Sequence, residues 1–185
     1  EALNRAFAKI ENNSILSSWK DSYASSGIDF DISEFIEVPT FGCFVDKRKL
    51  EFADKQETIN RIWSIGGETG WYYGNWLWKL RGLLDKLWGG VGLRRGRTSI
   101  TSINAGDTLD FWRVLYADRD KGRLLLFAEM KLPGEAWLEF KIVDNQLYQT
   151  ATFRPLGVLG RLYWFSVLPF HGFIFNGMLR ALARP

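Results

Sequence analysis

One very apolar stretch, residues 157–184, reads GVLGRLYWFSVLPFHGFIFNGMLRALAR. Its apolar side chains recur close to helical spacing from Leu159 to Leu182. Arg180 lies in the last turns, where a cation interacts favourably with the helix dipole. The pattern predicts one long helix, with a kink or a break at Pro169, because a proline ring crowds the preceding turn and lacks an N–H.

A membrane span is the alternative interpretation of this stretch. Its uninterrupted apolar run, residues 162–170, lies between Arg161 and His171 and contains Pro169. A spanning helix needs about 20 predominantly apolar residues. The sequence therefore favours a helix buried in a protein core.

The segment from residue 41 onwards predicts a strand followed by a short helix. Residues 41–52 are typical of a strand, with a polar turn near residues 46–48. Asp54 and Glu57 then have the spacing of a capping box, in which each side chain satisfies a backbone N–H of the first helical turn.

A second helix is predicted over residues 76–88. Asn75 is its candidate N-cap and Gly89 its C-terminal stop. Helical spacing gives it an apolar stripe, which consists of Trp76, Leu77, Leu80, Leu83, Leu84, Leu87 and Trp88.

The hydrophobic period then changes from helical to alternating. Four strands are predicted, over residues 108–116, 123–130, 136–143 and 147–153, joined by short polar turns. In the third of them, alternation turns Leu138, Phe140 and Ile142 inward and leaves Glu139 facing water.

The order of these elements predicts an α+β domain over residues 39–185. A curved antiparallel sheet wraps the long C-terminal helix, the arrangement called a helix-grip, and two shorter helices follow the first strand. Such an architecture often encloses a cavity. Residues 1–38 are interpreted as the tail of an upstream domain or as a packed arm, since the chain begins at Glu1 without a methionine.

Composition excludes several classes of site. The net charge of +3 is too small to predict nucleic-acid binding. The single cysteine, Cys43, excludes an internal disulfide framework and fits a reducing, cytoplasmic location. The single histidine excludes a His-cluster metal site, and we expect neither a metal nor a catalytic centre in this fragment.

Nine tryptophans and fourteen phenylalanines are enough to line a cavity as well as to fill a core. The candidate ligand contacts are Trp112, Arg113, Glu129, Tyr163 and His171. Which face of the sheet lines the cavity stays open, because Trp112 and Arg113 lie on opposite faces. His171 is interpreted as a core or pocket histidine rather than as a general acid or base, since it has no assignable partner.

Residues 79–97 are rich in basic and aromatic side chains. A surface of this kind binds phosphates or anionic lipids, and the candidate anion-binding residues are Arg94, Arg95 and Arg97. The alternative is a solvated helix face and loop, with Arg81 and Asp85 paired at i, i+4.

A set of short motifs resembles a bacterial domain-of-unknown-function family over about residues 40–185. The motifs are IGGETGW (65–71), LW (77–78), RGLLD (81–85), GG (89–90), RRGR (94–97), GD (106–107), DFWRV (110–114), MKLPG (130–134), WLEF (137–140), GVLGRLYW (157–164) and LPFH (168–171). The resemblance implies a fold of the START and pollen-allergen helix-grip superfamily (SRPBCC-type).

That family typically forms the C-terminal half of proteins whose N-terminal half is an NAD(P)-binding, short-chain-dehydrogenase- or epimerase-like domain. The resemblance implies that residues 1 to about 31 end such a domain, and that any NAD(P) cofactor would bind there. No dinucleotide fingerprint occurs in these residues, and the family provides no established catalytic residues, so oxidoreductase activity does not transfer to this chain.

We therefore expect a module that binds a hydrophobic or amphipathic small molecule between sheet and helix. Two alternatives remain open. One is a ligand-free module that docks on its own nucleotide-binding domain or on a second copy as a homodimer. The other is a binder of anionic surfaces through Arg94, Arg95 and Arg97.

Overall fold

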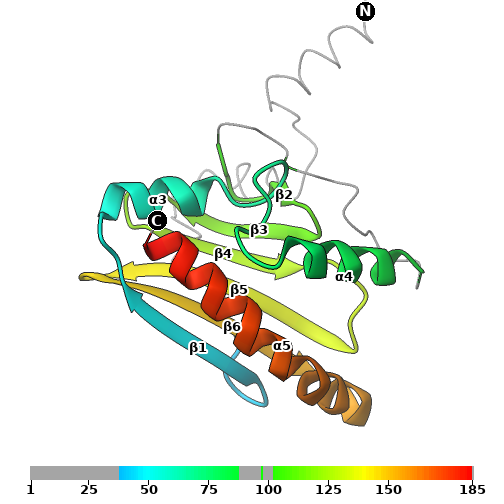
Figure 1. Cartoon of the computed structure of the whole chain (residues 1–185). Helices are drawn as coiled ribbons and strands as arrows, with labels where there is room; N and C mark the ends of the chain where they lie inside the picture. The colour runs from blue at the N-terminus through cyan, green and yellow to red at the C-terminus, as the bar shows by residue number, and fades with distance from the viewer. Residues whose placement is uncertain (1–37, 88–96, 98–101, 185) are drawn as a thin grey trace, which may run out of the picture. The chain divides into compact units, whose positions relative to one another are not determined.

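The computed structural model describes residues 38–87, 97 and 102–184, except for the side chains of Leu84 and Asp85. The elements follow the predicted order. They are β1 (Phe44–Glu51), α3 (Lys55–Trp63), α4 (Asn75–Leu87), β2 (Thr108–Leu109), β3 (Trp112–Asp118), β4 (Arg123–Ala128), β5 (Gly134–Val143), β6 (Gln146–Pro155) and α5 (Gly157–Ala183) (Figure 1). The predicted tail and the predicted stop at Gly89 lie outside the described residues, and the domain boundary near residue 38 stays a prediction.

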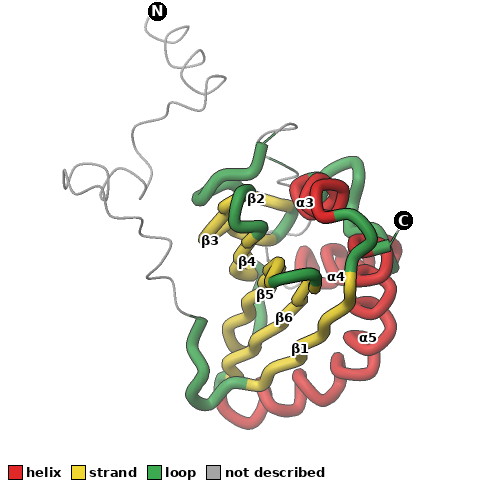
Figure 2. The backbone as a smooth tube through the Cα atoms, turned by 90° about the vertical axis from the view of Figure 1, so that its left-hand side faces the viewer, coloured by secondary structure: helices red, strands yellow, loops and turns green. Residues whose placement is uncertain are grey.

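Six antiparallel strands form one sheet in the order β1-β6-β5-β4-β3-β2. The strands β2 to β6 are joined to their neighbours in sequence, whereas β1 joins the far edge beside β6, with Phe44 opposite Phe153 and Leu50 opposite Leu147. The helices lie on one side of this sheet (Figure 2). The predicted α+β helix-grip architecture is therefore confirmed.

The alternation predicted for β5 is confirmed as well. Leu138 and Phe140 are fully buried, and Ile142 is nearly so, on the face that α5 covers. Glu139 points to the opposite face, where it pairs with Arg123 at 2.7 Å. Because successive side chains of a strand point to opposite faces, the sequence alone predicts which residues of a strand share a face.

The polar turn predicted at residues 46–48 is wrong, because β1 continues through these residues without interruption. Asp46 and Arg48 lie on the same strand face and pair at 2.9 Å. Arg48 also donates to Oδ1 of Asn176 in α5 at 2.6 Å. Because their opposite charges pair with each other, Asp46 and Arg48 can both lie on the face of β1 that meets α5.

The first strand of the predicted meander is divided in two. Asp110 has φ +55°, a left-handed conformation that ends β2 and turns the chain into β3. The Asp110 carboxylate accepts a hydrogen bond from Nε1 of Trp71 at 2.9 Å. This contact between distant segments holds a turn that strand propensity alone does not predict.

The predicted N-caps have different outcomes. Asp54 accepts from the backbone N–H of Glu57 at 2.6 Å, which confirms the start of α3. The Glu57 side chain pairs with Arg61 at 3.0 Å. Asn75 is instead the first residue of α4, and its side chain accepts from the N–H of Trp71, so it closes the preceding turn.

The long helix α5 crosses the sheet and runs through Pro169 without a break. Its second half is core: Ile174, Met178 and Leu182 are buried against the sheet and α3. Its first half is different, since Leu159 and Phe165 are 74% and 60% exposed. The prediction of a buried core helix holds only for the second half.

By length and composition alone, α5 could cross a membrane. Its most apolar window is 22% buried. Its second half nevertheless forms part of the domain core, beneath β6 and β1.

Candidate functional site

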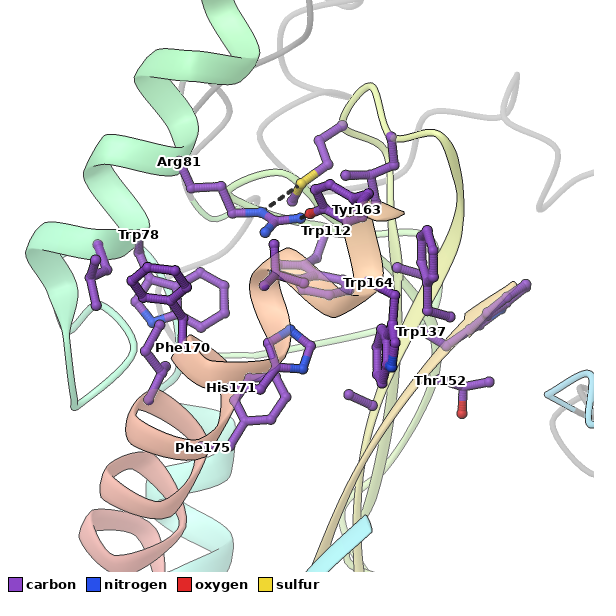
Figure 3. Close-up of a pocket in the computed structure, with 18 of the residues that line it drawn as sticks. Trp78, Arg81, Trp112, Trp137, Thr152, Tyr163, Trp164, Phe170, His171 and Phe175 are labelled. Carbon is purple, nitrogen blue, oxygen red and sulfur yellow. Dashed lines mark hydrogen bonds between the residues drawn. The ribbon is translucent and has the colours of Figure 1, made fainter. Parts of the chain in front are cut away.

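A cavity of about 460 Å³ lies between the sheet, α4 and α5. Its volume falls in the range of small-molecule sites, which extends over about 300–1,000 Å³. The helices contribute Leu77, Trp78, Leu80 and Arg81 from α4, and Tyr163, Trp164, Val167, Phe170, His171, Ile174 and Phe175 from α5 (Figure 3). The cavity is therefore built mainly from aromatic and aliphatic side chains on regular elements.

Stacked aromatic rings form one wall. Trp78 lies 5.0 Å from Trp71 and 5.9 Å from Phe111 between ring centroids, and Trp112 lies 5.7 Å from Phe111. The hydrogen bond from Trp71 to Asp110 fixes this stack to the β2–β3 turn. Burial raises the pKa of Asp110 above its ordinary value, while the Trp71 hydrogen bond acts in the opposite direction.

A second aromatic group closes the other side. Trp164 of α5 stacks on Phe153 of β6 at 5.8 Å and on Phe44 of β1 at 5.6 Å. His171 meets the edge of Trp164 at 5.2 Å and lies 4.5 Å from Phe175. Because strands and helix both hold these rings, this wall is defined without a ligand.

His171 is a neutral side chain in this wall. Burial lowers its pKa to about 4, and the nearby carboxylate of Asp46, 3.9 Å from Nδ1, only partly offsets burial. Its Nδ1 atom has no hydrogen-bond partner among the described residues. At neutral pH the imidazole is therefore uncharged and has an unused polar atom.

Arg81 and Tyr163 lie together at one end of the cavity (Figure 3). Arg81 donates from Nη2 to the Tyr163 hydroxyl at 2.6 Å and from Nε to the sulfur of Met130 at 2.9 Å. Two rim residues, Leu80 and Phe170, line the cavity and are also exposed to solvent. The cavity thus opens between α4 and α5.

Three of the five predicted ligand contacts line the cavity, namely Trp112, Tyr163 and His171. The structure places Arg113 and Glu129 outside it, where Arg113 pairs with Glu129 at 2.9 Å and donates to the carbonyl of Gly106. Trp112 is buried on the face of the sheet that the helices cover. This settles which face lines the cavity.

The predicted anion-binding loop is only partly described. Arg94 and Arg95 lie outside the described residues. Arg97 donates to the carbonyl oxygens of Trp63 and Ile65, at 2.9 and 3.2 Å, beyond the end of α3. Burial lowers its pKa. Its guanidinium group therefore holds backbone carbonyls in place.

The sequence pattern missed Trp78 and Arg81 because the predicted stripe matches the inward face of α4 only in part, at Leu77 and Leu80. Trp76 and Leu87, two members of the predicted stripe, are 64% and 73% exposed. Trp78 and Arg81 line the cavity instead, three residues apart on one face. An arginine three residues after a tryptophan was the signal in the sequence that could have identified this face of α4.

The ionisable side chains in the described lining of the cavity are Arg81, Lys131, Tyr163 and His171. No aspartate, glutamate or cysteine occurs among the lining residues that the structure describes. In the part of the chain that the structure describes, no group of three His, Cys, Asp or Glu side chains is placed to hold a metal ion.

Comparisons with known proteins give a family and two distant structures. Residues 42–178 match the family described as "Protein of unknown function (DUF2867)". A solution NMR structure from Thermobifida fusca is 16% identical, with 76% of this chain and 93% of that chain covered and a TM-score of 0.38. The crystal structure of Ara h 8.0201 is 12% identical, with 77% and 96% covered and a TM-score of 0.36. No curated protein matches the sequence.

Proposed function

The chain belongs to the DUF2867 family, and we propose that it binds a hydrophobic or amphipathic small molecule in the cavity between the sheet and helices α4 and α5. The observation that carries this proposal is the open volume of about 460 Å³ in an otherwise packed interior. Leu124, Leu126 and Leu138 on the covered face are fully buried. The atoms that line an apolar cavity lack van der Waals contacts on the cavity side, and a ligand that fills the cavity provides these contacts.

Within this proposal, Trp112, Tyr163 and His171 contact the ligand, together with Trp78 and Arg81. Arg113 and Glu129 are no longer included, because their ion pair lies outside the cavity. No catalytic role is assigned to any of these residues.

The resemblance of the sequence extends the proposal to the whole protein. We propose that an upstream NAD(P)-binding domain of the same chain is the partner of this module, that the ligand is presented to it, and that the protein is cytoplasmic. The single cysteine supports the last point, since a reducing compartment keeps thiols free.

Filling the cavity tests the proposal. Ala136 lines it on β5, and Ala136→Phe places a ring into the open volume. We expect a panel of amphipathic compounds to raise the thermal unfolding midpoint of the wild type, because a ligand that binds only the folded state stabilises it. The Ala136→Phe variant should lose at least about tenfold in affinity for the compounds that the wild type binds, which is about 1.4 kcal/mol.

Val45→Phe is the matched control. It adds the same ring at a residue of β1 that is 53% exposed and does not line the cavity. Binding should be unchanged in this variant. Equal midpoint shifts in wild type and Ala136→Phe, or no shift with any compound, would contradict the proposal.

A docking module is the second candidate function, and the exposed apolar residues of the helices favour it. Leu159, Leu162 and Phe165 in the first half of α5 are exposed, as are Trp76 and Leu83 of α4. Soluble monomers rarely expose large contiguous apolar patches. The occupant would be a second copy or the upstream domain, as expected from the sequence. The third candidate, an anionic-surface binder, gains no support from Arg97, which is engaged with carbonyl groups.

A further inference from the structure

We propose that the ligand of this cavity is an amphipathic anion whose acidic group binds Arg81. The apolar body of the molecule would lie between the two aromatic walls. This inference rests on the proposed function and specifies the chemical class of its ligand.

The charge of the lining is the first argument. Arg81 and Lys131 are the described lining residues that carry a charge at neutral pH, and the described lining includes no carboxylate side chain. His171 contributes no charge there, because its pKa is about 4. A charged group on a ligand in this cavity is therefore stabilised when it is negative and repelled when it is positive.

The hydrogen bonding of Arg81 is the second argument. Arg48, Arg61, Arg113, Arg123 and Arg154 each pair with a carboxylate. Arg81 lines the cavity and, like the exposed Arg119 and Arg184, has neutral acceptors among the described residues, here a phenol oxygen and a thioether sulfur. A guanidinium group has five N–H donors and forms its strongest hydrogen bonds, often two in parallel, with a carboxylate or phosphate. A bound anion would supply the acceptor that the described side chains do not.

The tryptophans of the wall are the third argument. Trp78 and Trp112 are each 7% exposed, and the Nε1 atom of each is buried without a hydrogen-bond partner among the described residues. Trp71, in the same stack, does have an acceptor in Asp110. An indole N–H only donates, and a buried donor without an acceptor costs about 1–3 kcal/mol. A ligand oxygen that reached either N–H would remove this cost.

Arg81 and Tyr163 are also well placed to receive a head group. Figure 3 shows the two side chains together at one end of the cavity, with His171 and Phe175 at the other. The Arg81 guanidinium carbon lies 5.8 Å from the centroid of the Tyr163 ring, in addition to its hydrogen bond with the hydroxyl. The tyrosine therefore holds the cation in position before a ligand arrives.

Three probes of equal chain length test the inference: decanoate, 1-decanol and decyltrimethylammonium. Their affinities for the wild-type chain are measured by titration calorimetry, below the concentrations at which they form micelles. We expect decanoate to bind at least about tenfold more tightly than decanol, and the cation to bind most weakly. In Arg81→Met, the preference for decanoate over decanol should disappear, because decanoate loses the larger share of its affinity.

Two further variants make the result specific. Arg180→Met removes one positive charge from an exposed position of α5 outside the cavity, and should keep the preference. Arg81→Lys keeps the charge but loses the planar fork, and should keep part of the preference; it also serves as the test if Arg81→Met does not fold. Equal affinities for the three probes in the wild type, or an unchanged preference in the folded Arg81 variants, would overturn the inference.

The outcome also separates this inference from the proposed function. If the wild type binds all three probes equally and Ala136→Phe binds none of them, the cavity remains a binding site. Only the preference for an anionic ligand is then rejected. A further arm offers sedimentable vesicles that contain phosphatidylglycerol. Lipid phosphorus that remains with the protein after sedimentation would identify the anion as a phospholipid. If decanoate binds but no lipid phosphorus is retained, the anion is a single-chain acid.

Discussion

At the scale of single residues, His171 is the histidine of an aromatic wall. It packs between Trp164 and Phe175, and burial is the largest cause of its low pKa. The unfolded chain, with a histidine pKa near 6.5, binds a proton in a pH range where the folded chain does not. Folding therefore excludes a proton from this site.

This difference predicts a loss of stability in acid. As the pH falls from 7 to 4.5, the unfolded state gains a proton at His171 that the folded state mostly lacks, so the free energy of unfolding falls by about 2 kcal/mol from this group. His171→Phe keeps an aromatic ring and removes the titration. Urea unfolding at both pH values should show a smaller decrease for the variant. Parallel decreases in the two proteins would show that His171 titrates normally in the fold.

Residue chemistry also explains which site residues could be predicted from the sequence. Trp112, Tyr163 and His171 were identifiable because aromatic and polar side chains stand out within apolar elements. Arg113 and Glu129 were equally conspicuous, yet they pair with each other at 2.9 Å. Whether a polar residue contacts a ligand or a neighbouring strand depends on cross-strand register, which a single strand's pattern does not contain.

At the scale of elements, helix α5 connects the core with the cavity. One face of its second half packs into the core, whereas its first half lines the cavity with Tyr163 and Trp164 and exposes Leu159 to solvent. Its start lies very close to the backbone at the start of β5 and the end of β6, since a Cβ atom added at Gly160 would overlap the carbonyl oxygen of Pro133 and lie 2.8 Å from Cα of Pro155. The glycine allows this close approach.

A pair of glycine substitutions in α5 tests this packing. Gly160→Ala should lower the free energy of unfolding by about 1–3 kcal/mol, because backbone atoms must move to admit the methyl group. Gly172→Ala is the control, since an added Cβ meets nothing within 4 Å there. That variant should gain up to about 1 kcal/mol from higher helix propensity. Equal stabilities of the two variants, measured by chemical denaturation, would mean that α5 does not begin against these backbone segments.

The elements also show where sequence patterns have their limit. Strands β4 to β6 and helix α5 were predicted within a few residues, because their periods of 2 and 3.6 are long and regular. The inward face of α4 was predicted only in part: Leu77 faces the cavity as expected, whereas the equally apolar Trp76 and Leu87 are exposed. Apolar residues on both sides of a helix leave its orientation to be decided by tertiary contacts.

At the scale of the whole described domain, two exposed apolar side chains form part of the cavity lining. Leu80 and Phe170 line the cavity and are 44% and 54% exposed. A mouth with an apolar rim fits entry of an amphipathic ligand, and further exposed apolar side chains of the same two helices are the surface that a docking partner would cover. Two measurements therefore distinguish ligand binding from docking: whether the cavity holds a small molecule, and how many copies of the chain the assembly contains.

Native mass spectrometry of the purified chain, followed by denaturing extraction, measures both. The wild type is analysed as purified and again after incubation with a lipid extract of the expression host, with Ala136→Phe in parallel. We predict a mass excess on the wild type that denaturation releases as an acidic, amphipathic compound, and that the variant lacks. A wild-type mass equal to that of the bare chain after the incubation, as monomer or as dimer, would contradict the assignment of this cavity as a ligand-binding site.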